Sequence, residues 1–347
     1  MAKGGKTIKD VARSLGVSAA TVSRALAGNS RISGETRDRV IKAAEAVGYV
    51  PNRAAQTLVS GGGTGFVGLV LTDPGYGRDD SYLSEFITGL GHGLAEHGVD
   101  LFLTAVPAGH SELSVIRNIV STRRADGLIL GRTSEVDPRV DWLTAQGFPF
   151  VTHGRVLDES AGHPWVDTDG AAAFAEAFAL LYGLGHRRFG LVTIEEPMTF
   201  RLHRTDGLVQ AMDRCGDPSV SLRIATSSRF EPESRRAAIH ALLTGPDRPT
   251  AVLALFDGLA LAVLQEAAVL GLSVPGDLSV IGFDNIASAV HARPGLTTFD
   301  SDTTEGARAS ARMLVARIAD GPDTDTPPET LLIRPKLVLR ASHGPAP

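Results

Sequence analysis

The sequence predicts an all-α helix-turn-helix module at the N-terminus, followed by an α/β core with parallel, doubly wound sheets. Three observations support this fold class. Residues 7–26 carry the capping and turn pattern of two short helices joined at a glycine. From Phe66 onward, short apolar runs alternate with amphipathic stretches, as in β-α units. The chain has 347 residues, so the part after residue 60 is long enough for two lobes of ordinary domain size.

The first predicted helix follows Thr7, which is suited to be its N-cap, with Asp10 three residues later. Gly16 ends this helix, because glycine tolerates the left-handed backbone of a tight turn between helices. The apolar positions recur at helical spacing and are Ile8, Val11, Ala12 and Leu15.

The second predicted helix spans 18–26, with Val17 filling the angle between the helices and Ser18 as its cap. We expect Val22 and Leu26 to be buried. Small outward side chains allow a helix to approach base edges in a major groove, an arginine can fork onto guanine, and hydroxyls can reach phosphates. The expected outward residues are Ala19, Ala20, Ser23 and Arg24, and Thr21 or Ser23 supplies the hydroxyl.

A third helix is predicted from 33 to 47, with Gly48 as its C-cap. Pro51 then begins a short helix of mostly small residues that ends in Leu58, a large apolar side chain with nothing nearby to pack on. The apolar positions of the third helix and its approach are Ile32, Val40, Ala43, Ala44 and Val47.

These motifs resemble those of the LacI/GalR (lactose-repressor) family of transcription regulators. The resemblance implies that Ala19, Ala20 and Arg24 read the major groove. It also implies that a hinge helix at about 51–59 places Leu58 in the central base step from the minor groove, which kinks the duplex. The matching residues, in order and spacing, are Thr7-Ile8-Lys9-Asp10-Val11-Ala12, Gly16-Val17-Ser18, Thr21-Val22-Ser23-Arg24 and Gly48-Tyr49-Val50-Pro51-Asn52-Arg53-Ala54-Ala55. The expected DNA contacts are Thr7, Ser18, Ala19, Ala20, Thr21, Ser23, Arg24, Asn52, Arg53, Ala55, Gln56 and Leu58.

Charge is distributed unevenly along the chain. Residues 1–60 hold ten Lys and Arg against four Asp and Glu, a net charge of +6. Since the whole chain has a net charge of −5, the remainder carries −11. A basic head on an acidic body allows the head alone to contact phosphates.

Composition argues against several other classes. A single cysteine, Cys215, excludes an internal disulfide framework and suits a reducing cytoplasm, and no apolar run is long enough for a signal core or a membrane span. The glycine-rich link at 60–65 precedes a strand and lacks the Gly-Lys-Ser/Thr ending of a phosphate loop.

An enzyme is not expected. His92 and His97 are five residues apart and point about 140° apart around a helix, which is unsuitable for one metal ion. Asp167 and Asp169 precede a helix, where capping or a crossover role is the simpler account. No Gly-x-Ser-x-Gly nucleophile motif occurs. We therefore expect no catalytic residue, no metal and no cofactor.

The β-α alternation predicts seven strands and seven helices after the link. The strands are expected at 66–72, 101–105, 127–130, 150–153, 189–194, 252–255 and 278–283. The helices are expected at 83–97, 113–122, 171–182, 204–215, 234–243, 259–270 and 303–319.

The family resemblance continues to about Arg340 and implies a two-lobe, periplasmic-binding-protein-like core with the effector between the lobes. Residues 1–60 would form the DNA-binding domain and 61–347 the effector-binding and dimerisation core. Crossovers near Trp165, Pro294 and Pro327-Pro328 would make both lobes discontinuous. The lobes would comprise about 65–164 with 295–326, and about 165–294 with 327–340.

Ligands of parallel sheets bind at the carboxyl ends of the strands. Polar residues follow the predicted strands at Asp73, Arg132, His153, Arg155, Asp257 and Asp284. By resemblance, Arg204 and Asp284 contact the effector, as an arginine fork and a carboxylate that clamp vicinal hydroxyls. Tyr82 falls where the family often places an aromatic ring. The expected effector contacts are Asp73, Tyr82, Arg132, Arg155, Trp165, Phe200, Arg204, Phe256 and Asp284.

One position departs from the family pattern. Many members have asparagine where this chain has Phe256, so an aromatic ring replaces a polar effector contact. The segment 148–155 resembles a subgroup linked to α-glucoside use.

We therefore expect a cytoplasmic, homodimeric repressor of carbohydrate-utilisation genes. It would bind a pseudo-palindromic operator, with a central CG step by resemblance, be nucleoid-associated when bound, and be released by a small sugar. Two alternatives remain open. One is a corepressor-dependent regulator that senses a purine or a sugar phosphate, and the other is a sugar-binding module without a regulatory role.

Overall fold

The computed structural model describes residues 6–26, 32–49, 63–71, 81–157, 162–321 and 326–347. The chain divides into two compact units. The first, called the head, comprises Met1–Phe66 with Arg123–Asp126, and the second, called the core, comprises Val67–Thr122 with Gly127–Pro347.

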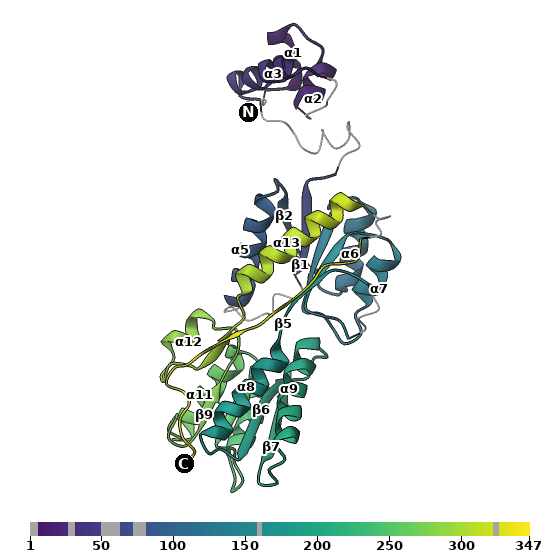
Figure 1. The fold of residues 1–347 in the computed structure, drawn as a ribbon. Coiled ribbons are helices and arrows are strands. Elements are labelled where there is room, and N and C mark those ends of the chain that lie inside the picture. Colours follow the sequence, from purple (N-terminus) through teal and green to yellow (C-terminus); the bar gives the residue numbers. More distant parts are fainter. Residues whose placement is uncertain (1–5, 27–31, 50–62, 72–80, 158–161, 322–325) are drawn as a thin grey trace. The chain divides into compact units, whose positions relative to one another are not determined.

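The described residues of the head form the helices α1 (Ile8–Leu15), α2 (Ala19–Leu26) and α3 (Gly34–Val47) (Figure 1). The predicted turn is present, because Gly16 has φ 64° at the end of α1, and Gly48 has φ 67° at the end of α3. The Ser33 side chain caps α3 by accepting from the Thr36 amide. The hydrophobic centre is made by all three helices, through Val11, Ala12, Val22, Ala25, Val40 and Ala44. In α2 the fully buried pair is Val22 and Ala25, whereas Leu26 is partly exposed.

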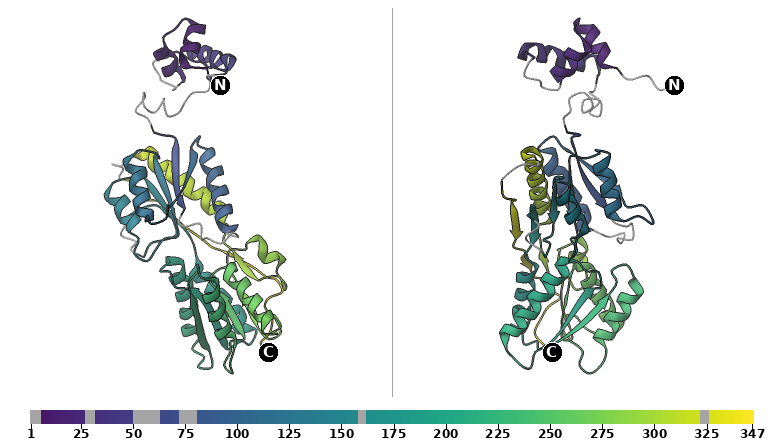
Figure 2. Two further views of the ribbon diagram at one scale, coloured as in Figure 1. Left: turned by 180° about the vertical axis from the view of Figure 1, so that it is seen from behind. Right: turned by 90° about the vertical axis from the view of Figure 1, so that its right-hand side faces the viewer.

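The core contains a six-stranded and a four-stranded sheet, which confirms the predicted parallel α/β architecture. The six-stranded sheet has the order β11-β5-β4-β3-β1-β2, and the four-stranded sheet has the order β7-β6-β8-β9. Every pairing recorded for β1, β3, β4, β5 and β11, and for β6 to β9, is parallel. We call the part built on the six-stranded sheet the first lobe and the part built on the four-stranded sheet the second lobe (Figure 2).

The strands and helices of the core have the following bounds. The strands are β1 (Phe66–Leu71), β2 (Asp100–Ala105), β3 (Gly127–Gly131), β4 (Phe150–His153), β5 (Trp165–Thr168), β6 (Arg188–Ile194), β7 (Ser221–Ser227), β8 (Ala251–Ala254), β9 (Ser279–Ile281), β10 (Thr298–Asp300), β11 (Thr330–Ile333) and β12 (Lys336–Val338). The helices are α5 (Ser81–Ala95), α6 (Glu112–Ser121), α7 (Pro138–Ala145), α8 (Gly170–Gly183), α9 (Thr199–Cys215), α10 (Pro232–Leu243), α11 (Asp257–Val269), α12 (Ala287–His291) and α13 (Thr303–Asp320).

Each lobe contains one closely packed pair of helices. In the first lobe α5 packs along α13, where a Cβ at Gly89 would lie 2.7 Å from the Thr304 carbonyl oxygen. In the second lobe α8 packs along α9, where a Cβ at Gly207 would lie 2.3 Å from the Ala171 carbonyl oxygen. Glycine at these crossings therefore sets the distance between the helices.

The chain changes sheets a few residues later than the sequence predicted. Trp165 opens β5, which pairs with β4, and β11 pairs with β5, so both strands belong to the first lobe. The segment after Pro294 continues along the second lobe as far as β10, which pairs with β12. Prolines mark local turns, but backbone hydrogen bonding decides which sheet a strand joins. Figure 1 shows the last segment of the chain, in yellow, running beside β5.

Several elements were missing from the sequence prediction. They are α7, α12, β5, β7, β10, β11 and β12. Strand β7 lies at a sheet edge and has partly or fully exposed side chains at most positions, so it lacks a continuous apolar run. Among the residues that the structure describes, no helix is both long and apolar enough to cross a membrane.

Candidate functional site

The outward face of α2 carries the side chains predicted to read DNA. Ala20 and Arg24 are exposed, Ser23 is partly exposed, and Ala19 is half-buried against the hydrophobic centre of the head. Small residues beside an exposed arginine allow close approach to base edges. The folded helix thus presents Ala20, Ser23 and Arg24 outward as predicted, whereas Ala19 packs partly against the interior of the head.

The predicted hydroxyl contacts also cap the helices. The Thr21 amide donates to Ser18 Oγ at 3.0 Å, and the two hydroxyl oxygens are 2.8 Å apart. The Thr7 amide and hydroxyl both donate to the Asp10 carboxylate at 2.9 Å, and these bonds lower the pKa of Asp10. These residues therefore fix the starts of α1 and α2, and each hydroxyl keeps further hydrogen-bonding capacity for a phosphate.

Six of the predicted contacts lie outside the described residues. They are Asp73, an expected effector contact, and Asn52, Arg53, Ala55, Gln56 and Leu58, which the sequence analysis predicts to lie on a hinge helix.

The second lobe brings Arg204 and Asp284 together, as the sequence predicted. Arg204 lies on α9 and is 9% exposed, and its Nη2 atom is 3.8 Å from Asp284 Oδ1. Its Nη1 donates to the Leu255 carbonyl, and its guanidinium lies 3.7 Å from the centre of the Phe283 ring. Asp284 has φ 102°, an unusual backbone conformation for a residue other than glycine. The turn after β9 thus turns its carboxylate towards the arginine.

Helix α8 makes room for this arginine. Gly170 opens α8, and a Cβ at this position would lie 2.7 Å from Arg204 Cγ. Burial lowers the pKa of Arg204, and the negative charges of Asp284 and Asp167 oppose that shift. Among the described residues, Arg204 Nε has no hydrogen-bond acceptor although it is buried. The unpaired Nε atom marks Arg204 as a candidate ligand contact, because buried donors are normally paired.

Tyr82 on α5 extends the site into the first lobe. Its ring stacks on Phe86 with centroids 6.1 Å apart and an angle of 6° between the ring planes. Burial raises the pKa of Tyr82, the charge of Asp284 raises it further, and Arg132 and Arg204 lower it. Tyr82 is therefore within electrostatic range of charged side chains from both lobes.

A pocket in the first lobe adjoins Tyr82. Its lining includes Arg132, one of the expected effector contacts, and Glu112, which was not among them. Burial raises the pKa of Glu112, and Arg139 opposes that shift. Ser111-Glu112 has the pattern of a helix start, so the sequence marks this glutamate as a first-turn residue and gives no sign of its pocket position. The lining residues are Leu69, Val70, Leu71, Tyr82, Leu83, Phe86, Glu112, Gly131 and Arg132.

Arg155 contacts both Asp167 and Trp165 near the predicted crossover at Trp165. Arg155 Nε donates to Asp167 Oδ2 at 2.9 Å, and the guanidinium lies 5.6 Å from the centre of the Trp165 ring. Asp169 accepts from the Ala172 amide and caps α8, which confirms its predicted capping role. None of these residues lines the pocket in the first lobe.

The remaining predicted residues have packing partners. Phe200 faces the Arg204 guanidinium at 5.0 Å and, like Phe256, packs against the hydrophobic centre of the second lobe. Asp257 is fully buried, where it accepts from the Thr298 hydroxyl at 2.6 Å and the Ile286 amide at 3.0 Å. Burial raises the pKa of Asp257 to about 7. Asp257 therefore holds the turn after β9 rather than a ligand.

His153 belongs to the interior of the first lobe. Its ring lies 4.6 Å from the Phe86 ring, and its Nδ1 atom is 3.3 Å from Ser310 Oγ. Burial lowers the pKa of His153 to about 4. Within the described part of the chain, no three His, Cys, Asp or Glu side chains gather as a metal site.

The sequences of both units match known protein families. Residues 7–52 match the family described as bacterial regulatory proteins, lacI family, and residues 178–343 match the periplasmic binding protein-like domain. The regulator AglR of Rhizobium meliloti (strain 1021) is 34% identical over 344 residues, which cover 98% of this chain and 95% of that protein. The repressor CytR of Escherichia coli (strain K12) is 33% identical over 315 residues, which cover 89% of each.

A solved structure described as a transcriptional regulator CelR-cellobiose complex has the same fold. Its TM-score is 0.72 at 29% sequence identity, and the match covers 97% of this chain and 99% of that one.

A capped helix-turn-helix head, joined to a two-lobe core in which charged and aromatic residues lie on helices and in the turns after parallel strands, defines a DNA-binding transcription regulator rather than an enzyme. The identity to AglR and CytR, which extends over most of each chain, shows the family of regulators. The chain belongs to the LacI family of regulatory proteins.

Proposed function

We propose that this regulator is a homodimeric repressor of carbohydrate-utilisation genes that a small sugar releases from its operator. The observation that carries the proposal is the placement of Arg204 and Asp284 beside the partly exposed Phe200 ring. An arginine and a carboxylate suit the vicinal hydroxyls of a pyranose, and aromatic faces suit its apolar side.

The relatives support a sugar as the ligand. CelR, 29% identical in its solved complex, is described with cellobiose bound. The segment 148–155 resembles a subgroup linked to α-glucoside use. Maltose and cellobiose are therefore the first ligands to test.

The DNA-bound state would use both the head and the hinge. Two heads on a two-fold dimer would read the half-sites of a pseudo-palindromic operator through Ala19, Ala20 and Arg24. Both hinge helices would insert Leu58 at a central CG step. Such a protein would act in the cytoplasm and be nucleoid-associated while bound.

Release would follow from a change between the lobes. A ligand shifts the protein towards the released state only by as much as it prefers that state. The polar groups of both lobes around Tyr82 and Arg204 would supply this preference, because charges from both lobes act on these two side chains.

A corepressor-dependent response to a purine or a sugar phosphate is the second candidate. It is favoured by Phe256 at a position where many members have asparagine, and by the three cationic side chains Arg132, Arg155 and Arg204 in the candidate site. A phosphate would pair with arginine forks, and a purine would stack on an aromatic ring.

A thermal-shift panel on the full chain tests the proposal. At one hundred times its Kd a ligand stabilises the folded state by about 2.7 kcal/mol, which is a readily measured shift. We expect maltose or cellobiose to raise the melting temperature and to release a palindromic operator. A shift with purines or sugar phosphates alone, together with tighter operator binding, would replace the sugar proposal by the second candidate.

A further inference from the structure

The turn after β3 has an unusual backbone conformation. Arg132 has φ 54°, in the left-handed region that is unfavourable for residues other than glycine. This conformation needs support from its surroundings, and such residues gather at functional sites. Arg132 also lines the pocket beside Tyr82, so the turn contributes directly to the candidate site.

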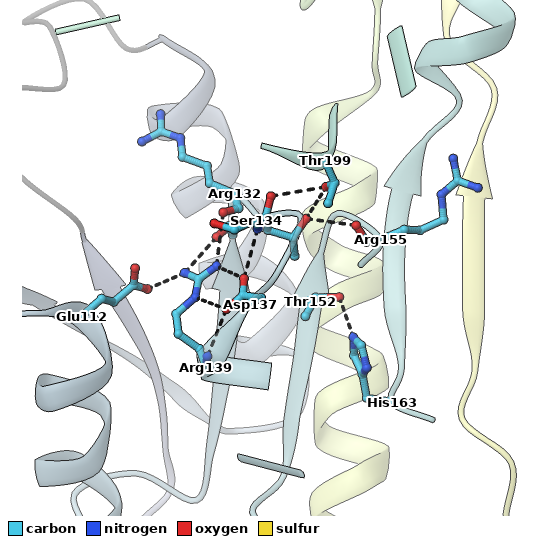
Figure 3. A network of polar contacts seen from close by, with 11 residues as sticks. Glu112, Arg132, Ser134, Asp137, Arg139, Thr152, Arg155, His163 and Thr199 are labelled. Atoms are coloured by element: carbon cyan, nitrogen blue, oxygen red, sulfur yellow. Dashed lines mark hydrogen bonds and ion pairs between the residues drawn. The ribbon is translucent and has the colours of Figure 1, made fainter. Parts of the chain in front are cut away.

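Arg139 on α7 holds this turn from inside the first lobe. It is 7% exposed. Its Nη1 donates to the Gly131 carbonyl and its Nη2 donates to the Arg132 carbonyl, both at 3.2 Å. Ion pairs of 2.6 Å to Asp137 and to Glu112 fix the guanidinium. Figure 3 shows this cluster, with the Arg132 guanidinium pointing away from it.

Asp137 ties the end of the same turn to α7. Its Oδ2 accepts from the Ser134 amide at 3.1 Å, and its Oδ1 accepts from the Arg139 amide and Nε. The pKa of Asp137 is lowered by these bonds and by Arg139, although burial opposes the shift. The carboxylate and the guanidinium thus hold both ends of the turn in one buried network.

The far side of the turn joins the second lobe. The Thr199 amide donates to the Thr133 carbonyl at 3.0 Å, and the two threonine hydroxyl oxygens are 2.7 Å apart. The Glu135 amide donates to the Pro197 carbonyl at 2.9 Å, and Arg201 forms a 2.6 Å ion pair with Glu135. Thr133 and Thr199 are both buried, so water does not compete for these bonds.

We propose that Arg139 is a positioning residue of the effector site, which holds residues 131–135 so that Arg132 faces the pocket while Thr133 and Glu135 bind the second lobe. Effector contact at Arg132 is thereby coupled to the contact between the lobes. Arginine suits this role because its planar fork serves two carboxylates and two carbonyls at once, which a lysine ammonium cannot. The effector part of the inference rests on the proposed function, whereas the positioning part does not.

The first test needs no effector. Amide hydrogen exchange is measured by mass spectrometry on three full-length proteins: the unsubstituted chain, Arg139→Lys and Asp137→Asn. We expect the Glu135 and Thr199 amides, which bridge the lobes, to exchange about tenfold faster in both variants while β6 amides stay unchanged. Unchanged exchange at Thr199 in both variants would overturn the proposal. Equal acceleration at Thr199 and in β6 would also overturn it, because it would mean general destabilisation.

Arg187 supplies a matched control. Its Nε donates to Asp217 at 3.0 Å, and its Nη1 donates to the Tyr182 and His186 carbonyls, in the second lobe. Arg187→Lys should leave exchange at Glu135 and Thr199 unchanged. If Arg187→Lys accelerates these two amides as much as Arg139→Lys does, the effect is not specific to the turn and the proposal is wrong.

The second test measures the response to maltose and cellobiose. We expect Arg139→Lys to raise the sugar concentration for half-release of operator about tenfold, with Arg187→Lys responding as the unchanged protein does. An unchanged response in Arg139→Lys would overturn the coupling to the effector. If neither sugar releases the unchanged protein, the proposed function fails for these sugars, while the exchange result still decides the positioning role.

Discussion

Arg204 and Asp284 approach each other to 3.8 Å between Nη2 and Oδ1, a separation wider than a direct hydrogen bond. The arginine is held in place by the Leu255 carbonyl and by the Phe283 ring rather than by the carboxylate. A ligand hydroxyl that bridges the two charged groups from one side would therefore leave the arginine where it is. This preorganisation reduces the cost of binding.

Asp284→Ala should abolish release by the effector and leave operator binding intact, because the carboxylate lies in the core and DNA contacts are expected in the head. Fluorescence anisotropy with labelled operator, titrated with maltose and cellobiose, measures both properties. Asp247→Ala changes an exposed aspartate of the same lobe and should respond normally. If Asp284→Ala is released at the usual sugar concentration, the effector role of this carboxylate is wrong.

Arg24→Ala should weaken recognition of the half-site by roughly 1–3 kcal/mol if the arginine forks onto a guanine. The measurement is selection of binding sites from random DNA, followed by affinity for the selected sequence. Arg13→Ala removes an arginine on α1 that is 78% exposed and paired with Asp10, so it should leave the sequence preference unchanged. An identical preference in Arg24→Ala would contradict the assignment.

Gly207→Ala should destabilise the second lobe, although alanine favours helices over glycine by about 1 kcal/mol. The added Cβ would lie 2.3 Å from the Ala171 carbonyl oxygen, and forcing α8 and α9 apart costs about 1–3 kcal/mol. Gly183→Ala, at the end of α8 with nothing within 4 Å, should be neutral or slightly stabilising. Urea unfolding of both variants decides this. Equal stability of Gly207→Ala and the unchanged protein would show that the helices can separate easily.

His163 should make the stability of the first lobe depend on pH. Its ring is 6% exposed, and its Nε2 atom is 3.1 Å from the Thr152 hydroxyl oxygen. Burial lowers the pKa of His163 to about 4, from an ordinary value of 6.5. The unfolded chain therefore binds a proton between these values when the folded chain does not, so this contribution is complete above pH 6.5 and is lost as the pH falls to 4.

The comparison with His163→Gln isolates this contribution, because the glutamine amide keeps a partner for Thr152 and does not titrate. Between pH 6.5 and 4 the unchanged protein should lose up to about 1.4 kcal/mol more per pH unit than the variant. Unfolding by urea at several pH values provides the measurement. Parallel pH profiles would mean that His163 titrates normally.

The sequence by itself determined the head and the order of strands and helices. Capping residues and glycines act within a few positions along the chain, so Thr7, Gly16, Ser33 and Gly48 specify the helix boundaries that the structure has. Buried strands such as β8 are apolar throughout, which makes them visible as short hydrophobic runs. Edge strands such as β7 are half-exposed, and their sequence is too mixed to give that signal.

Only the tertiary structure decided which lobe each crossover strand joins and which side chains meet. Hydrogen bonds between β5 and β11 join segments far apart in the chain, and no local pattern encodes such pairing. The contact between Glu112 and Arg139 is likewise not encoded locally. From the local sequence, Glu112 is an acid in a first helical turn and Arg139 is an arginine on a helix. They meet because α6 and α7 both flank the turn after β3, where burial turns two ordinary surface residue types into one ion-paired cluster.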